Sequence, residues 1–257
     1  MYLEIKSLFI PTENKERTLR ILLPDDYDHS EQSYPVLYMH DGQNLFEDKT
    51  SFSGHSWGVY ETLKRHKIDH LIVVGIDNSD LRLFEYSPWT CSDIVKEMTK
   101  IEVGGLGDVY ASWMVYQLKP WVESNYRVDT KHAMIAGSSM GAYISCYIAN
   151  KYPEFFQTVG IFSLASWFNE PKLLSFMESQ ETNQNQRYFI SVGSHESENE
   201  KLNQAYINNS VNLKDLLLKK GITDLLFVET DEGHNELAWR LIFERFIDFA
   251  VQKKHGN

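Results

Sequence analysis

Cysteine is scarce in this chain: only Cys91 and Cys146 occur among 257 residues, and they form no CxxC pair. This count excludes a disulfide-rich scaffold, and we expect two buried free thiols because Cys146 lies in an apolar stretch. Zinc-type ligand spacings and glycine-rich phosphate loops are missing as well. The sequence therefore implies no metal and no organic cofactor.

Positive charge is also in short supply. The chain has 25 Lys and Arg against 36 Asp and Glu, a formal net charge of −11 at pH 7. Because such a surface repels phosphate backbones and anionic lipids, we expect neither nucleic-acid nor membrane partners. No apolar run approaches the roughly eighteen residues of a membrane helix. Residues 1–10 alternate apolar and polar types and lack a signal-peptide core, so a cytoplasmic protein is expected.

The composition is typical of one globular domain covering residues 1–257, with 42% hydrophobic and 24% charged residues. Short β-branched and aromatic runs alternate with segments of helical period. This rhythm predicts an α/β fold with a mostly parallel central sheet, helices on both faces and an N-terminal antiparallel hairpin. The hairpin is expected at 2–24, further strands at 35–39, 70–76, 132–136, 158–162, 188–192 and 224–228, and helices at 59–66, 108–123, after 139 and at 236–253.

The segment Gly137-Ser138-Ser139-Met140-Gly141 joins an expected strand to an expected helix. A nucleophile elbow requires this context, because small residues two places before and after the serine let strand and helix approach each other. Gly137 and Gly141 meet that requirement. Ser139 is therefore the candidate nucleophile, with Ser138 as its rival nearby. The Met140 amide, at a helix N-terminus, is a candidate donor to an oxyanion.

A serine nucleophile needs a base, and histidine titrates in the right pH range. Hydrolases with such an elbow use the chain order serine, acid, histidine, so the base is expected after a late strand. His234 lies between the last expected strand and the last expected helix, beside Gly233, which allows a turn. His195 follows the preceding strand, where the acid is expected, and His255 lies in the C-terminal tail. His234 is the candidate base.

The imidazole in turn needs a carboxylate on its other nitrogen. Glu196 follows the strand at 188–192 and is the first candidate, with Glu198 second. Glu200, Asp231 and a dyad without any acid stay open. Asp231 is only three residues before His234, and a carboxylate that close more often shapes the turn.

A second oxyanion donor is expected from the loop after the strand at 35–39. There Gly42 allows an unusual turn that can point the backbone amide of Gln43 into the site. We interpret Asp41 and Asn44 as turn formers, and His40 as a packed histidine.

The polar loop at 77–89 is long enough to suggest a functional role. Arg82, Tyr86 and Trp89 are candidates for one wall of the substrate pocket, where Arg82 would meet an anionic or phenolic group. An internal ion pair between Arg82 and Glu85 is the preferred alternative.

Taken together, these segments resemble the serine esterases related to esterase D, bacterial feruloyl esterases, enterobactin-type siderophore esterases and secreted mycolyltransferases. The matching residues span most of the chain in the family's order: 40–46, Trp57 with 61–63, 75–78, 85–89, 118–120, 137–141, Tyr152 with Pro153 and Phe156, Phe162 with Ser163 and Trp167, and His234 followed by Trp239. Ala142 departs from a second glycine common after the motif. Some siderophore esterases of this kind resemble Ser/His dyads that lack the acid.

The resemblance implies an α/β-hydrolase fold in which Ser139 is the nucleophile, His234 the base and Glu196 the acid. The backbone amides of Gln43 and Met140 are the implied oxyanion donors. The expected activity is hydrolysis of a small-molecule carboxylic ester through an acyl-enzyme. An acyltransferase with the same triad, siderophore or feruloyl specificity, and a non-catalytic binding protein remain as alternatives. The aromatic content permits a homodimer.

Overall fold

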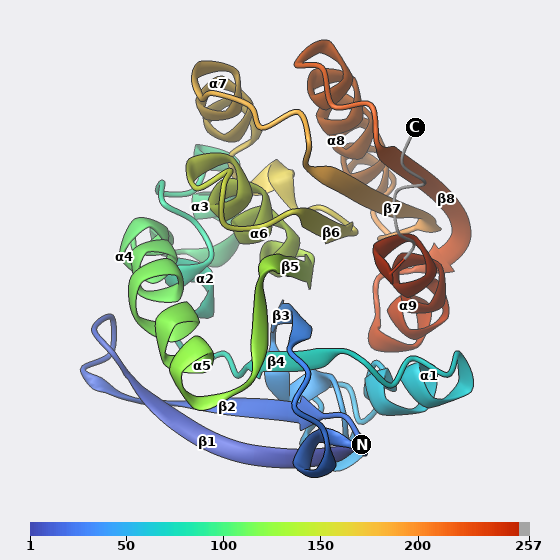
Figure 1. Ribbon diagram of the computed structural model, residues 1–257. Helices are drawn as coiled ribbons and strands as arrows, with labels where there is room; N and C mark the ends of the chain where they lie inside the picture. The colour runs from blue at the N-terminus through green and yellow to red at the C-terminus, as the bar shows by residue number, and fades with distance from the viewer. Residues whose placement is uncertain (252–257) are drawn as a thin grey trace.

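An eight-stranded sheet runs through the computed structural model, which describes residues 1–251 (Figure 1). Its strands, in chain order, are β1 (Tyr2–Ile10), β2 (Lys15–Leu23), β3 (Tyr34–His40), β4 (Ile72–Ile76), β5 (Val128–Ser138), β6 (Thr158–Phe162), β7 (Arg187–His195) and β8 (Leu225–Gly233). Their order across the sheet is β1-β2-β4-β3-β5-β6-β7-β8. Strands β3 to β8 run parallel, whereas β1 pairs with β2 and β2 with β4 antiparallel. The predicted mixed sheet with an N-terminal hairpin is confirmed.

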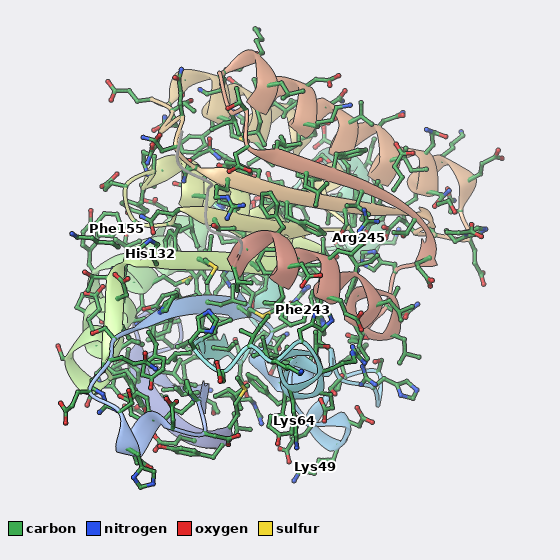
Figure 2. The ribbon with its side chains drawn as sticks, turned by 45° about the vertical axis from the view of Figure 1, so that its right-hand side comes forward. Lys49, Lys64, His132, Phe155, Phe243 and Arg245 are labelled. Atoms are coloured by element: carbon green, nitrogen blue, oxygen red, sulfur yellow. The ribbon has the colours of Figure 1, made fainter. Side chains whose placement is uncertain are left out.

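Helices cover both faces of this sheet, as the sequence predicts. On one face lie α1 (Val59–Arg65) and α9 (Glu236–Val251), which contact each other. On the other lie α4 (Gly107–Trp113), α5 (Lys119–Asn125), α6 (Met140–Lys151), α7 (Glu170–Ser179) and α8 (Glu200–Lys219), together with the shorter α2 (Arg82–Glu85) and α3 (Asp93–Thr99). Phe243 on α9 is buried, whereas Arg245, two residues later, is exposed (Figure 2).

The pleat of the strands divides the core into two layers. Val36 and Tyr38 of β3 belong to the cluster beneath α4 to α8, whereas Leu37 and Met39 belong to the cluster beneath α1 and α9. Successive side chains of a strand point to opposite faces, so a strand covered on both sides is apolar throughout. This burial explains the continuous apolar runs by which the parallel strands are recognised in the sequence.

Two predicted segments differ in detail from the structure. The expected helix at 108–123 is α4, a π-helical turn η4 (Met114–Leu118) and α5. Pro120 explains the interruption, because proline has no N–H for an i to i−4 bond and its ring clashes with the preceding turn. The expected loop at 77–89 contains α2. The last two residues of the helix expected at 236–253 lie outside the described residues.

Both cysteines are buried free thiols, as predicted. Within residues 1–251, no helix combines the length and apolar character needed to cross a membrane.

Candidate active site

Ser139 lies at the sharp turn between β5 and α6, with φ 55° and ψ −121°. A positive φ is strained for a residue with a Cβ, and such strain persists only where the surrounding structure enforces it. The two glycines of the motif allow the turn to close. A Cβ on Gly137 would lie 2.6 Å from the carbonyl carbon of Gly141, and one on Gly141 would lie 3.2 Å from Cβ of His40. The steric requirement deduced from the motif is therefore present in the fold.

The loop after β3 lies beside this turn, because β3 and β5 are adjacent and in register from Val36 to Met39. Gln43 occupies the 3₁₀ turn η2 (Gly42–Asn44), which begins after Asp41 in a left-handed conformation. Within residues 1–251, neither the Gln43 nor the Met140 backbone amide donates a hydrogen bond to another protein group. Two free amides thus flank the turn that carries Ser139.

His234 and Glu196 form a polar pair at this edge of the sheet. His234 Nδ1 lies 2.7 Å from Oε2 of Glu196, which is only 5% exposed. The other carboxylate oxygen accepts hydrogen bonds from the Gly193 amide and the Ser163 hydroxyl, each at 2.7 Å. A carboxylate accepts hydrogen bonds, so Nδ1 is the donor in this contact and Nε2 is the ring nitrogen left for a second partner. A general base for Ser139 requires this orientation of the ring.

A second set of contacts fixes this pair in place. Ser163, directly after β6, adopts a left-handed φ of 50° and accepts a hydrogen bond from Trp239 Nε1 at 2.9 Å. The Trp239 ring packs edge-on against His234, with centroids 5.0 Å apart. Asn44 reaches from the β3 loop to Glu236, two residues after His234, at 3.3 Å. The loops after β3, β6 and β8 are thereby held together.

The structure does not join Ser139 to His234: no hydrogen bond links their side chains among the described residues. Such bonds are commonly long before substrate binds and tighten in the complex. Tyr206 of α8 is the neighbour that sequence reasoning missed. Its ring lies 4.9 Å from the His234 ring; burial raises the pKa of its hydroxyl, while Trp167 and Ser139 act in the opposite direction. No motif marks Tyr206, since only the packing of α8 brings it to this edge.

The rival residues lie elsewhere. Glu198 and Glu200 are exposed. Asp231 accepts a hydrogen bond from Ser194 at 2.8 Å and lies 3.3 Å from Nδ1 of His195, so these two rivals face each other on the surface. The rival base His255 lies outside the described residues.

Arg82 contacts a different carboxylate from the one expected. The preferred Arg82–Glu85 ion pair is wrong, because Arg82 forms a two-pronged contact with Asp41, at 2.7 and 2.9 Å. Glu85 is fully buried and pairs instead with Arg17 of β2, at 2.9 Å. Both pairings join segments distant in the sequence, which local spacing could not indicate. Asp41 is a turn former, as expected, and also the anchor of α2.

Tyr86 and Trp89, the other candidates for a pocket wall, are occupied by packing. Tyr86 has no exposed surface, and its hydroxyl lies 3.3 Å from Asp41. The Trp89 ring packs on Tyr147 and Phe176, with centroid distances of 5.5 and 5.6 Å. Tyr86 therefore contacts the carboxylate of Asp41 from within the core, and its side chain is not accessible to a ligand.

His40 is a packed histidine, as expected, and is 2% exposed. Burial lowers its pKa to about 4; Asp41 opposes this shift and Arg82 adds to it. Its Nδ1 lies 3.0 Å from the Tyr110 hydroxyl. His40 is thus neutral near pH 7 and unsuited to be the base for Ser139.

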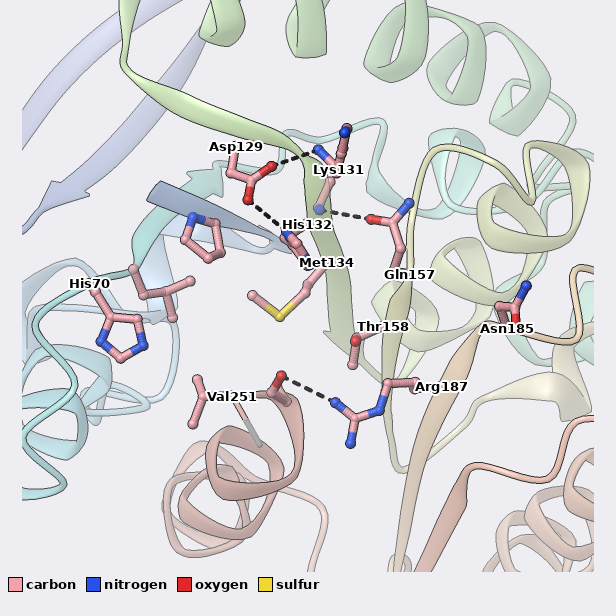
Figure 3. A pocket seen from close by; sticks show the side chains of 14 residues that line it. His70, Asp129, Lys131, His132, Met134, Gln157, Thr158, Asn185, Arg187 and Val251 are labelled. Atoms are coloured by element: carbon pink, nitrogen blue, oxygen red, sulfur yellow. Dashed lines mark hydrogen bonds and ion pairs between the residues drawn. The ribbon is translucent and has the colours of Figure 1, made fainter. Parts of the chain in front are cut away.

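A cavity of about 580 Å³ lies at the other edge of the sheet, where β3, β5, β6 and β7 begin (Figure 3). Its rim includes the contact of His132 with Asp129, at 2.6 Å, and Arg187, which donates to the Ala250 carbonyl. None of the candidate site residues lines it. Among residues 1–251 there is no cluster of three or more side chains suited to hold a metal ion.

Known proteins resemble this chain over most of its length. The family model described as "Putative esterase" matches residues 11–246. The chain belongs to this esterase family. The uncharacterized protein YbbA of Bacillus subtilis is 26% identical over 221 residues, which cover 84% of each chain. Esterase MT1326 of Mycobacterium tuberculosis is 28% identical over 136 residues, 52% of this chain and 26% of that protein.

Solved structures of this kind share the fold. A ferulic acid esterase superposes with a TM-score of 0.73 at 17% identity, covering 97% of this chain and 98% of its own. An IroE-like serine hydrolase from Shewanella oneidensis gives 0.72 at 20% identity, over 95% of this chain and 81% of its own. The enterobactin esterase FES from Shigella flexneri gives 0.69 at 19% identity, over 97% and 58%. These likenesses confirm the predicted α/β-hydrolase fold.

Proposed function

We propose that this protein hydrolyses carboxylic esters through an acyl-enzyme on Ser139, with His234 as general base and Glu196 as the acid that orients it. The backbone amides of Gln43 and Met140 are the proposed oxyanion donors. The observation that carries the proposal is the 2.7 Å contact between His234 Nδ1 and a buried carboxylate beside the strained Ser139 turn. Membership of an esterase family supports the same reaction.

In the first step, His234 Nε2 takes the Ser139 hydroxyl proton while Oγ bonds to the ester carbonyl carbon. The carbonyl electron pair moves onto oxygen, where the two free amides face the new negative charge. When the carbonyl re-forms, the bond to the alcohol oxygen breaks and that oxygen takes the proton from His234. Water then repeats the sequence on the acyl-enzyme, which releases the acid and restores Ser139.

Labelling with a fluorophosphonate probe tests the nucleophile. We expect the wild-type protein and the Ser138→Ala variant to be labelled, and Ser139→Ala to remain unlabelled. Equal labelling of wild type and Ser139→Ala would contradict the assignment. Thermal unfolding of each variant checks that the turn is still folded.

An ester panel then defines the reaction more closely. It varies acyl length, aromatic acids including a feruloyl ester, and lactones including a siderophore-type trilactone. We expect turnover that Ser139→Ala abolishes. Adding free alcohols and analysing the products separates hydrolysis from acyl transfer, since a transferase forms new esters. A folded wild-type protein with no turnover across the panel would instead indicate a non-catalytic binding protein.

A further inference from the structure

Tyr206 is a buried phenol at the histidine side of the candidate nucleophile. It is 4% exposed, and its ring lies 4.9 Å from the His234 ring at an angle of 47°. Burial raises the pKa of Tyr206, while its contacts with Trp167 and Ser139 act in the opposite direction. The phenol is therefore neutral near pH 7 and has a proton to donate beside the His234 ring.

Trp167 brings a second donor to the same place. Its ring packs edge-on against Tyr206, with centroids 6.2 Å apart at 74°. Its Nε1 is buried and makes no hydrogen bond of normal geometry within residues 1–251, although it lies close enough to the Tyr206 hydroxyl to act on the pKa of that group. A buried donor without a partner is uncommon in folded proteins and calls for an explanation. An acceptor atom supplied by a ligand is such an explanation.

Hydrogen bonds from helix α8 hold the segment that carries Trp167 in place relative to Tyr206. Asn209 lies three residues after Tyr206 on α8, so the two side chains share one helix face. With its amide turned to satisfy its neighbours, the Asn209 oxygen accepts from the Trp167 backbone amide at 3.0 Å and the Ser166 hydroxyl at 2.9 Å. Its nitrogen then donates to Glu170 at 3.0 Å. Helix α8 thereby fixes Trp167 relative to Tyr206 before any ligand binds.

We propose that Trp167 Nε1 and the Tyr206 hydroxyl form a subsite that binds an oxygen acceptor in the alcohol portion of the ester. The proposal rests on the proposed function. In that mechanism the leaving alcohol takes its proton from His234, so groups on the His234 side of Ser139 face the alcohol and not the oxyanion. Preferred substrates are therefore esters whose alcohol carries an ether, hydroxyl or carbonyl oxygen close to the ester oxygen.

A matched pair of substrates isolates this contact. Butyl butyrate and 2-methoxyethyl butyrate have alcohol chains of equal length and differ by one CH₂-to-oxygen exchange. We measure kcat/KM for both with wild type, Trp167→Phe and Tyr206→Phe, each of which removes one donor and keeps a ring. Trp121→Phe on α5 and the exposed Tyr116→Phe are the matched controls. Dividing the methoxyethyl-to-butyl ratio of a variant by that of wild type cancels the different intrinsic reactivity of the esters.

We expect the ratio to fall about tenfold in each donor variant, the effect of one lost hydrogen bond, and to stay unchanged in the controls. Fluorophosphonate labelling of Ser139 should stay within about twofold of wild type in the two control variants. An unchanged ratio in both donor variants, with turnover that still needs Ser139, overturns the subsite and leaves the esterase proposal standing. Equal loss of kcat on both esters in Tyr206→Phe also overturns it, because the hydroxyl would then serve Ser139 or His234. Absence of turnover and of labelling in wild type overturns both proposals.

Discussion

Two buried carboxylates lie at the same edge of the sheet, and they differ in the side chain with which each is paired. Glu196, after β7, and Asp41, after β3, are each 5% exposed. Glu196 faces an imidazole at 2.7 Å, whereas Asp41 faces the Arg82 guanidinium at 2.7 and 2.9 Å. Both side chains are carboxylates buried to the same extent. They differ in whether the partner can exchange a proton.

Burial opposes the ionisation of Asp41, but the charge and hydrogen bonds of Arg82, with help from Asn78, hold the pKa of that carboxyl below its usual value. Arginine keeps its proton at any ordinary pH, so the Asp41 pair stays charged and fixed. The partner of Glu196 is an imidazole, a group that can accept and donate protons in catalysis, so the Glu196 pair can take part in proton transfer. The chemistry of the partner thus separates a structural carboxylate from a candidate catalytic one.

The largest effect is expected from Glu196→Gln. The amide cannot stabilise the imidazolium form of His234, so kcat should fall by about 10⁴ while the melting temperature changes little. Steady-state kinetics on a responsive ester, with circular dichroism of the unfolding transition, measures both. Glu198→Gln is the matched control, because Glu198 is exposed. A Glu196→Gln enzyme with wild-type kcat would favour a dyad without an acid.

Asp41→Asn should affect stability first. It leaves the buried end of Arg82 without a counter-charge, and removing one partner of a buried pair costs about 3–5 kcal/mol. Because Arg82 is 27% exposed, we expect the lower end of that range. Urea denaturation measures the free energy of unfolding, with the exposed Asp80→Asn as control. A loss below that of the control variant would show that Asp41 and Arg82 do not stabilise each other.

His40 lies next to Asp41 in the chain, and we expect its buried imidazole to make the stability of the fold depend on pH. Its folded pKa is about 4, below the unfolded value of 6.5. Between these values the unfolded chain binds a proton that the folded protein does not, so stability falls as pH drops from 6.5 to 4. The loss is at most about 3 kcal/mol. Urea titrations of wild type and His40→Gln across this window should show a shallower decline in the variant; parallel declines would exclude His40 as the cause.

The smallest effect is expected from Asp231→Asn. Asp231 is 92% exposed and pairs with His195 and Ser194, so neither the Glu196 pair nor the Asp41 pair depends on it. Unfolding free energy should change by less than about 0.5 kcal/mol and kcat by less than about twofold. A kcat loss comparable to that of Glu196→Gln would move the role of the acid to Asp231.

Local chemistry explains why much of the fold is readable from the sequence. Apolar runs such as the one in β4 follow from burial on both faces of the sheet. The spacing of Gly137 and Gly141 follows from a steric contact between residues only four positions apart in the chain. The loops carrying Glu196 and His234 follow from the chain order of the strands. Arg82 shows the limit, because its nearest carboxylate in sequence, Glu85, is not its partner in space. The partner of Arg82 depends on how the loops pack against each other, and the spacing of residues in the sequence does not indicate that packing.

The sequence by itself determined the alternation of strands and helices, the strained turn at Ser139 and the order in which the candidate residues meet the sheet edge. These depend on side-chain type and on separations of a few residues, where sterics and hydrophobic period act directly. Only the tertiary structure decided that Tyr206 packs on His234, that Asp41 pairs with Arg82, and that Glu196 rather than Asp231 reaches His234. Each of those contacts joins segments tens of residues apart, and the twist and register of the sheet set their distance.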